Sequence, residues 1–237
     1  MTNRLEIIPV IDVMGGKVVH ARGGIRADYP LLKSVLTTST QPLHVIADLL
    51  AWYDFSTIYL ADLDAICDQK RDFNLYRAIV EQFPQLTVYL DAGVQTQQDW
   101  QQIASLSTVY PVIGSETVIE SSWLKDEAVR QKSILSLDFK HDQFLGNKQI
   151  LANPDDWSEK VIAMNLEHIA SQQGPDLDLL TTLKMKAPQS QIIAAGGVRI
   201  EQDLITLAKQ GIKQVLVASA LHNGDLDKAC VTKFSTG

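Results

Sequence analysis

The sequence predicts an α/β protein, a single (β/α)8 TIM barrel, and three observations carry this prediction. Short apolar runs rich in β-branched residues recur along the whole chain of 237 residues. Amphipathic stretches with helical spacing lie between most of these runs. The chain also repeats itself, as expected for a barrel built from two half-barrels. We expect one domain over residues 1–237, with half-barrels at about 1–125 and 126–237.

Each predicted strand is apolar on successive residues, as expected where helices cover one face of a parallel sheet and the barrel interior covers the other. The strands are expected at 7–11, 58–60, 86–90, 109–113, 134–137, 161–164, 191–195 and 214–217. Helical spacing of apolar residues predicts helices at 42–53, 73–83, 97–106, 177–186 and 202–210. A doubly wound sheet also alternates strand and helix, but it rarely needs eight strands from so short a chain.

Internal repetition predicts a two-fold barrel. Gly197 follows Gly93 by 104 positions, and each is followed by Val and, six residues on, by Asp. The same offset relates Ser115 to Ser219. In a barrel of two equivalent halves, the ends of the first and fifth strands lie opposite each other. Asp12 should therefore face Asp138.

Composition excludes several functional classes. The net charge is −7, whereas a nucleic-acid or anionic-membrane surface needs a basic excess. The two cysteines, Cys67 and Cys230, cannot build a secreted disulfide framework. The early apolar run is too short for a signal peptide, and no run approaches membrane-spanning length. We expect a cytoplasmic protein with no cofactor, no obligate protein partner and, because the histidines lack ligand spacing, no metal.

Acidic residues that end strands are the catalytic candidates, because active sites of such barrels lie at the C-terminal strand ends. Asp12 and Asp138 end the first and fifth strands and could act as general base and general acid. Alternatively, each caps a loop or pairs with a nearby lysine, Lys17 or Lys140.

Further candidates follow the first, second and fifth strands. Asp62 and Asp64 could take part in catalysis or cap the next segment. His20 and His141 could contact a substrate, and Lys17 is a further possible site residue. The segment 21–41 is either a substrate lid or a packed loop.

Glycines and small polar residues after the last two strands predict a phosphate site, since backbone N–H groups there can approach an anion closely. This set comprises Gly196, Gly197, Ala218 and Ser219. The symmetry-related set, Gly93, Gly114 and Ser115, predicts a second anion site. That second prediction is weaker, because Asp91 and Ala92 stand where a phosphate loop prefers glycine.

Four motifs together resemble one family. They are Pro-Val-Ile-Asp-Val-Met-Gly-Gly-Lys-Val-Val at 9–19, Asp-Leu-Asp at 62–64, Leu-Asp at 137–138 and Ala-Gly-Gly-Val at 195–198. They resemble, in order and over nearly the whole chain, the histidine-biosynthesis barrels, namely the phosphoribosylformimino-aminoimidazole carboxamide ribotide isomerase and the imidazole-glycerol-phosphate synthase cyclase. The resemblance implies acid–base catalysis by Asp12 and Asp138 in an Amadori-type aldose-to-ketose isomerisation. It also implies two phosphate sites that hold a bisphosphorylated ribotide.

The isomerase resemblance is the closer one, because the lysine-rich entrance through which the cyclase takes ammonia is not found. Gln95 stands where family members carry an arginine that helps hold substrate, while Arg199 occupies the equivalent place in the other half. Ala218-Ser219 replaces the usual Gly-Arg or Gly-Ser, and the segment 165–174 lacks the isomerase pattern. Loss of a guanidinium removes bidentate anion recognition, so a different substrate is expected.

These departures resemble a divergent isomerase-like branch of methylotrophs and methanogens, which implies a role in one-carbon cofactor (methanopterin or methanofuran) biosynthesis. The leading hypothesis is thus an isomerase-like enzyme for a small phosphorylated metabolite. One alternative is the true histidine-pathway isomerase, with Arg199 replacing the missing arginine from the opposite side. Another is a non-catalytic barrel that binds a phosphometabolite.

Overall fold

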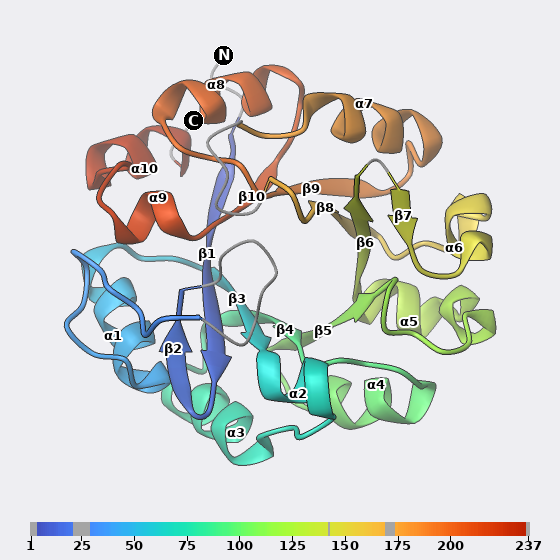
Figure 1. Ribbon diagram of the computed structural model, residues 1–237, viewed down its shortest axis with the longest axis horizontal. Helices are drawn as coiled ribbons and strands as arrows, with labels where there is room; N and C mark the ends of the chain where they lie inside the picture. Colours follow the sequence, from blue (N-terminus) through green and yellow to red (C-terminus); the bar gives the residue numbers. More distant parts are fainter. Residues whose placement is uncertain (1–3, 21–28, 142, 169–173, 236–237) are drawn as a thin grey trace.

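The computed structural model describes residues 4–20, 29–141, 143–168 and 174–235, which form a closed (β/α)8 barrel (Figure 1). Each barrel strand pairs in parallel with the next, and the last pairs with the first through Glu6 and Gln214. In chain order the barrel strands are β1 (Glu6–Met14), β3 (Thr57–Asp62), β4 (Thr87–Asp91), β5 (Val109–Gly114), β6 (Ile134–Lys140), β8 (Lys160–Asn165), β9 (Gln191–Ala195) and β10 (Gln214–Val217). The predicted fold class and all eight predicted strands are confirmed.

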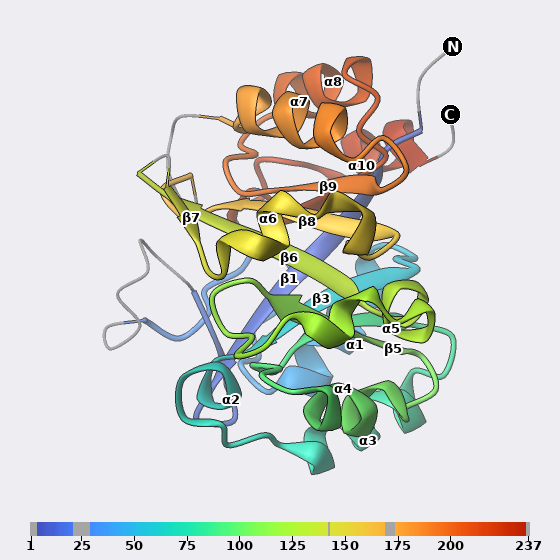
Figure 2. The ribbon, with the colours of Figure 1, turned by 90° about the vertical axis from the view of Figure 1, so that its right-hand side faces the viewer.

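Helices surround the barrel (Figures 1 and 2). They are α1 (Pro42–Trp52), α2 (Leu63–Asp68), α3 (Phe73–Gln82), α4 (Gln97–Ala104), α5 (Glu127–Lys132), α6 (Lys148–Ala152), α7 (Leu177–Lys186), α8 (Glu201–Lys209), α9 (Ser219–His222) and α10 (Lys228–Ser235), with 3-10 turns η2 (Ser122–Lys125) and η3 (Pro154–Asp156). Side-chain caps explain several starts. Thr96 and Asp99 form a capping box at α4, and the Asp176 carboxylate accepts the Leu179 N–H at α7.

Two hairpins extend the barrel at equivalent places, and the sequence analysis missed both. β2 (Lys17–Val19) pairs antiparallel with β1, and β7 (Gln143–Leu145) pairs antiparallel with β6. Asp12 lies opposite Val19, and Asp138 lies opposite Leu145. The two predicted catalytic aspartates therefore occupy the same register position in the two halves.

The core has two apolar regions, one inside the barrel and one between the strands and the helices. Side chains of a strand alternate between these regions, because successive residues point to opposite faces. Tyr59, Tyr89 and Ile134 belong to the inner region. By the same alternation Asp91 and Asp138, which lie an even number of residues further on, point inward at the end of their strands.

The two ends of the described chain meet on one side of the barrel. The Leu5 N–H donates to the Phe234 carbonyl over 3.1 Å, and α10 packs against β1 (Figure 2). Within the described ranges, every helix is too short or too polar to cross a membrane.

Candidate active site

Three carboxylates gather around one buried phenol at the C-terminal strand ends. The strand register places Asp12 and Asp91 on either side of Ala61, in the strands that flank β3. Burial raises the pKa of the inward-facing Tyr59 well above its usual value, and the charges of Asp91, Asp138 and Asp12 raise it further. The predicted pair Asp12 and Asp138 is thus brought to one site, where Asp91 joins it.

Asp138 is buried and only 6% exposed. Burial raises its pKa to about 7, with the charges of Glu116 and Asp91 acting in the same direction and hydrogen bonds from Ser136 and Ser115 opposing them. The Ser136 hydroxyl donates to Oδ1 over 2.8 Å, while the Asp138 N–H donates to Ser115 Oγ over 3.0 Å. A carboxyl group with such a pKa can both give and take a proton near neutral pH.

Asp91 was overlooked as a site residue, although it also ends a strand. The Tyr59 hydroxyl donates to Asp91 Oδ2 over 3.1 Å, and the Gly93 N–H donates to Oδ1 over 3.3 Å. Its position at the end of β4 was the available signal, because the rule that selected Asp12 and Asp138 selects it as well.

The predicted phosphate corner lies at the ends of β9 and β10. Gly196 and Gly197 have φ angles of +89° and +81°. A Cβ on Gly197 would lie 2.1 Å from the Gly174 carbonyl oxygen, so this position needs glycine. Ala218 immediately precedes α9, and Ser219 Oγ at its start lies 3.1 Å from Nε2 of His20. His20 therefore lies within hydrogen-bonding distance of Ser219, one of the predicted phosphate-binding residues.

The symmetry-related donors have partners inside the protein. Ser115 is fully buried, and its hydroxyl lies 2.7 Å from the Leu145 carbonyl oxygen and 3.2 Å from Asp138 Oδ2. Its N–H donates to the Ser136 carbonyl. Gly114 ends β5, where a Cβ would lie 3.1 Å from Thr117 Oγ1.

Two arginines hold equivalent aspartates in the two halves. Arg199 binds the Asp203 carboxylate through Nε and Nη2, at 3.1 and 3.0 Å. Arg71, which comes from the loop after α2, lies 2.9 Å from Asp99 Oδ1 and also donates to the Gly93 carbonyl. A guanidinium is therefore present in the half that carries Gln95, although a different loop provides it and sequence reasoning missed it.

Asp62, the last residue of β3, caps α2, which supports the capping alternative for this residue. Asp62 is 2% exposed, accepts the Ala65 N–H at the start of α2, and accepts the Tyr76 hydroxyl. Asp64 accepts the Gly15 N–H over 2.6 Å. Lys17 lies opposite Met14 in the first hairpin, whereas Asp12 lies opposite Val19.

The segment after the first hairpin is packed where it is described. Residues 21–28 of the predicted lid or loop lie outside the described residues. Leu31 bridges to Val19, and the Val35 N–H donates to the carbonyl of His222. In the turn of the second hairpin, Nδ1 of His141 lies 2.7 Å from Oε1 of Glu167, in the loop after β8.

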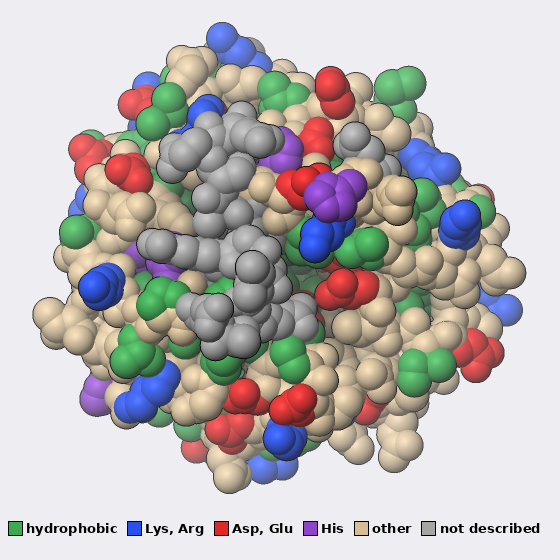
Figure 3. All heavy atoms as spheres, in the orientation of Figure 1, with side chains coloured by type: hydrophobic (Ala, Val, Ile, Leu, Met, Phe, Trp, Pro, Cys, Tyr) green, Lys and Arg blue, Asp and Glu red, His purple; other side chains and the backbone are tan. Residues whose placement is uncertain are grey.

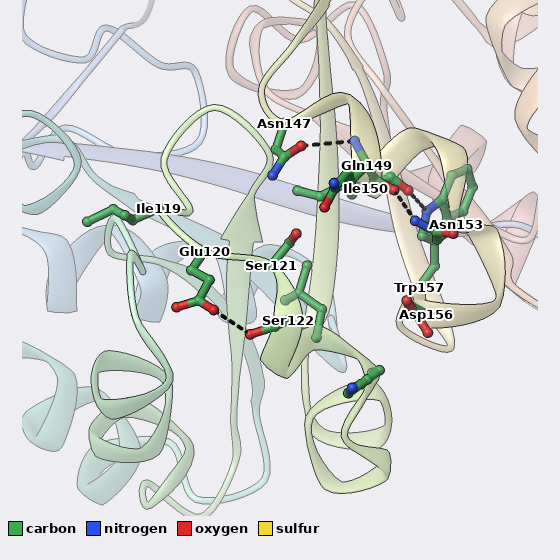
Figure 4. Close-up of a pocket in the computed structure, with 12 residues that line it drawn as sticks. Ile119, Glu120, Ser121, Ser122, Asn147, Gln149, Ile150, Asn153, Asp156 and Trp157 are labelled. Atoms are coloured by element: carbon green, nitrogen blue, oxygen red, sulfur yellow. Dashed lines mark hydrogen bonds between the residues drawn. The ribbon is translucent and has the colours of Figure 1, made fainter.

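Charged side chains and histidines gather near the centre of the face shown in Figure 3. A separate pocket of about 300 Å³ lies between the residues around η2 and those of α6 and η3, with Glu120, Asn147 and Trp157 in its lining (Figure 4). None of the three strand-end carboxylates lines that pocket. In the described part of the chain, no three His, Cys, Asp or Glu side chains are grouped to hold a metal ion.

Fold and site together define a (β/α)8 barrel whose candidate active site is an acidic cluster at the C-terminal strand ends. The family model described as "Histidine biosynthesis protein" matches residues 6–227, so the chain belongs to this family.

Relatives cover nearly the whole chain. An uncharacterized protein of Methanocaldococcus jannaschii is 29% identical, with 97% of this chain and 99% of the relative covered. The 1-(5-phosphoribosyl)-5-((5-phosphoribosylamino)methylideneamino)imidazole-4-carboxamide isomerase of Leuconostoc mesenteroides is 25% identical, with 94% and 97% covered. The isomerase of the same name from Parabacteroides distasonis is 26% identical, with 98% and 100% covered.

Proposed function

We propose that the protein is a cytoplasmic, cofactor-independent enzyme that converts an aldose to a ketose, by an Amadori-type reaction, in a small phosphorylated metabolite. The observation that carries this proposal is Asp138, a buried strand-end carboxyl group with a pKa of about 7, in one cluster with Asp12. Family membership supports the same chemistry, because the isomerases among the relatives share the whole barrel.

The reaction needs one acid and one base. A protonated carboxyl group gives its proton to the ring oxygen as the sugar ring opens. Opening breaks the C1–O bond, and the lone pair of the nitrogen on C1 forms a C1=N iminium group. A carboxylate then removes the proton from C2, the C–H electron pair forms a C1=C2 double bond, and the C1=N pair returns to nitrogen. The C2 hydroxyl then loses its proton to form the carbonyl group as C1 gains a proton. The raised pKa of Asp138 suits it to donate the first proton, which leaves Asp12 as the base.

The substrate phosphate is assigned to the corner between β9 and β10. Gly196, Gly197, Ala218 and Ser219 would offer backbone N–H groups, and Ser219 adds a hydroxyl beside His20. In the described part of the chain, the N–H groups of Gly197 and Ser219 have no acceptor within hydrogen-bonding distance. Arg199 lies next to this corner, where its guanidinium is paired with Asp203.

The substrate differs, in this proposal, from the histidine-pathway ribotide. Gln95 and Asp91 replace the residues expected of a ribotide isomerase, and a relative from a methanogen is 29% identical, compared with 25% and 26% for the two isomerases described above. We place the chain in an isomerase-like branch of methylotroph or methanogen type that serves one-carbon cofactor (methanopterin or methanofuran) synthesis.

Two alternatives make different predictions. A true histidine-pathway isomerase is favoured by the isomerases that match over the whole chain. A barrel that only binds a phosphometabolite would keep ligand-induced stabilisation after loss of either aspartate. Ligand at about 100 times its Kd should stabilise the fold by about 2.7 kcal/mol, which a melting curve resolves.

The test is an assay of the purified protein on the bis-phosphoribosyl ribotide and then on phosphorylated sugars that carry an amine on C1. Asp12→Asn and Asp138→Asn are compared with the wild type, and Asp155→Asn, an exposed carboxylate on η3, serves as the matched control. Turnover of the ribotide would establish the histidine-pathway alternative. Full turnover of the accepted substrate by both Asp12→Asn and Asp138→Asn would refute the mechanism.

A further inference from the structure

One position distinguishes the two pseudo-symmetric halves of the barrel mouth. Asp91 ends β4, and Ala195, 104 positions later, ends β9. Each lies two residues before the glycine of its loop, Gly93 or Gly197. Tyr89 and Ile193, two residues earlier, both face the barrel interior, so the inward side chain at the strand end is a carboxylate in one half and a methyl group in the other.

The carboxylate of Asp91 accepts a hydrogen bond from the Gly93 N–H, the group that would otherwise donate to an anion. The Gly93 N–H donates to Asp91 Oδ1 over 3.3 Å. In the next loop the Ser115 N–H donates to the Ser136 carbonyl. The N–H groups of Gly93 and Ser115 therefore both have acceptors inside the protein.

The opposite half is arranged in the reverse way. Ala195 offers no acceptor to the Gly197 N–H, and among the described residues nothing else accepts from it. Ser219, the counterpart of the fully buried Ser115, is partly exposed and meets His20. The Gly93 N–H thus has an acceptor within its own half, whereas the Gly197 N–H has none among the described residues.

Negative charge strengthens this difference. Asp91 and Glu116 lie close enough to Asp138 for their charges to act on its carboxyl group. A phosphate dianion placed beside Gly93 would lie close to the Asp91 carboxylate, where like charges in a partly buried site repel each other. Charge repulsion and the absence of a free N–H donor therefore both disfavour a phosphate beside Gly93.

We propose that Asp91 is a specificity-determining residue that restricts the substrate to a single phosphate group, held at the corner of β9 and β10, and excludes a second phosphate beside Gly93. The substrate is then a monophosphorylated metabolite whose other end carries no anionic group. This inference rests on the proposed function, since it assigns the phosphate of that reaction to one half of the mouth.

A merely structural role of Asp91 is the competing explanation, because its carboxylate also accepts from the buried Tyr59 hydroxyl. Two variants separate the roles. Asp91→Asn removes the charge and leaves an oxygen that can accept from Tyr59. Asp91→Ala copies Ala195 and releases the Gly93 N–H. Glu120→Gln, which removes one negative charge from the loop after β5, is the matched control.

The experiment measures Kd by calorimetry for two probes, ribose 5-phosphate and the bis-phosphoribosyl ribotide. We expect Asp91→Ala and Asp91→Asn to bind the ribotide at least about 10-fold more tightly than the wild type, with ribose 5-phosphate changed by less than about 3-fold. Glu120→Gln should change neither. Equal gains for both probes, or no gain for the ribotide in folded variants, would overturn the inference.

Failure of the proposed function looks different. If neither the wild type nor any variant binds ribose 5-phosphate, no phosphate site exists at the corner of β9 and β10. Both the proposed function and the role of Asp91 would then be wrong. Binding of ribose 5-phosphate by the wild type, with a ribotide affinity that Asp91→Ala leaves unchanged, would overturn only the assignment to Asp91.

Discussion

Ser219 Oγ lies 3.1 Å from Nε2 of His20, so the loop after β10 is joined to the residue that follows β2. The counterpart in the other half is Ser115, which packs against Gly146, the residue that follows β7. A Cβ on Gly146 would lie 2.1 Å from the Ser115 carbonyl oxygen. The His20 imidazole therefore contacts Ser219 in one half, whereas in the other half the backbone of Gly146 packs against Ser115.

His20 and Ser219 are expected to act together on the substrate phosphate. His20→Ala and Ser219→Ala should each weaken ribose 5-phosphate binding about 10-fold, because a hydrogen bond to a charged group contributes roughly 1.5–3 kcal/mol. The double variant should lose less than the sum, since the two side chains are in contact. Calorimetric Kd values check this, with the exposed His44→Ala as control. Unchanged affinity in both single variants would remove the pair from the site.

Asp138 should make the fold less stable as the pH rises. Its pKa is about 7 in the folded protein, against 3.8 for an ordinary aspartate, so its stabilising contribution is complete below about pH 4 and is lost as the pH rises through 7. Asp138→Asn stays neutral and should gain roughly 1–3 kcal/mol relative to the wild type between pH 5 and pH 8. Urea unfolding at both pH values measures this, and a constant difference would contradict it.

Glu116 should tune the same carboxyl group. Its charge helps to raise the pKa of Asp138, after the larger effect of burial. Glu116→Gln should therefore shift the limb of the pH profile of kcat/KM that reports Asp138 to lower pH, by about half a unit to one unit. The profile is recorded on the accepted substrate, with Glu120→Gln for comparison. If Glu116→Gln leaves this limb of the profile at the same pH as in the wild type, the limb reports the titration of a group other than Asp138.

His222 should give the fold the opposite dependence on pH. Burial lowers its pKa to about 4, and its Nδ1 lies 2.9 Å from Ser34 Oγ. The stability that comes from this neutral imidazole is present above about pH 6.5 and is lost as the pH falls toward 4. Between pH 7 and pH 5, the unfolding free energy of His222→Asn should fall less than that of the wild type. We expect this smaller change even if the variant is less stable than the wild type at both pH values. A slope equal to that of the wild type would exclude this role.

Arg71 should matter more for stability than Arg199. Its guanidinium is 11% exposed and joins Asp99 to the carbonyls of Ala92 and Gly93, while Arg199 is 34% exposed. Arg71→Ala should destabilise by roughly 1–3 kcal/mol, because buried carbonyls lose their donors. Arg199→Ala should lose less unfolding free energy than Arg71→Ala, because its ion pair with Asp203 is more exposed to solvent. Equal losses in chemical unfolding would contradict the buried role of Arg71.

The barrel was predictable because each strand is a continuous apolar run and the helices α1, α3, α4, α7 and α8 are periodic, signals that depend on local sequence alone. The hairpin strands β2 and β7 were missed because they are three residues long and polar at their first residue. Asp12 and Asp138 were predicted from their positions at strand ends. Asp91 obeys the same rule, but it was interpreted only as a poor phosphate-loop residue.

The arginine of the first half could not have been located from sequence. Arg71 reaches Asp99 from a loop that lies 28 positions earlier in the chain, and only the folded barrel brings the two together. The burial of Ser115 likewise depends on the second hairpin, whose Leu145 carbonyl meets its hydroxyl. Such contacts are set by long-range packing, which a local pattern does not encode.

The hydrogen bond between Leu5 and Phe234 brings the first barrel strand and the last helix within reach of one linker. A circularly permuted chain is therefore feasible, with the old ends fused and new ends opened before α5, near residue 126. Such a permutant would begin with the half-barrel at 126–237 and end with the half that carries Asp91. The two halves would then be synthesised in the opposite order, while every contact in the barrel is kept.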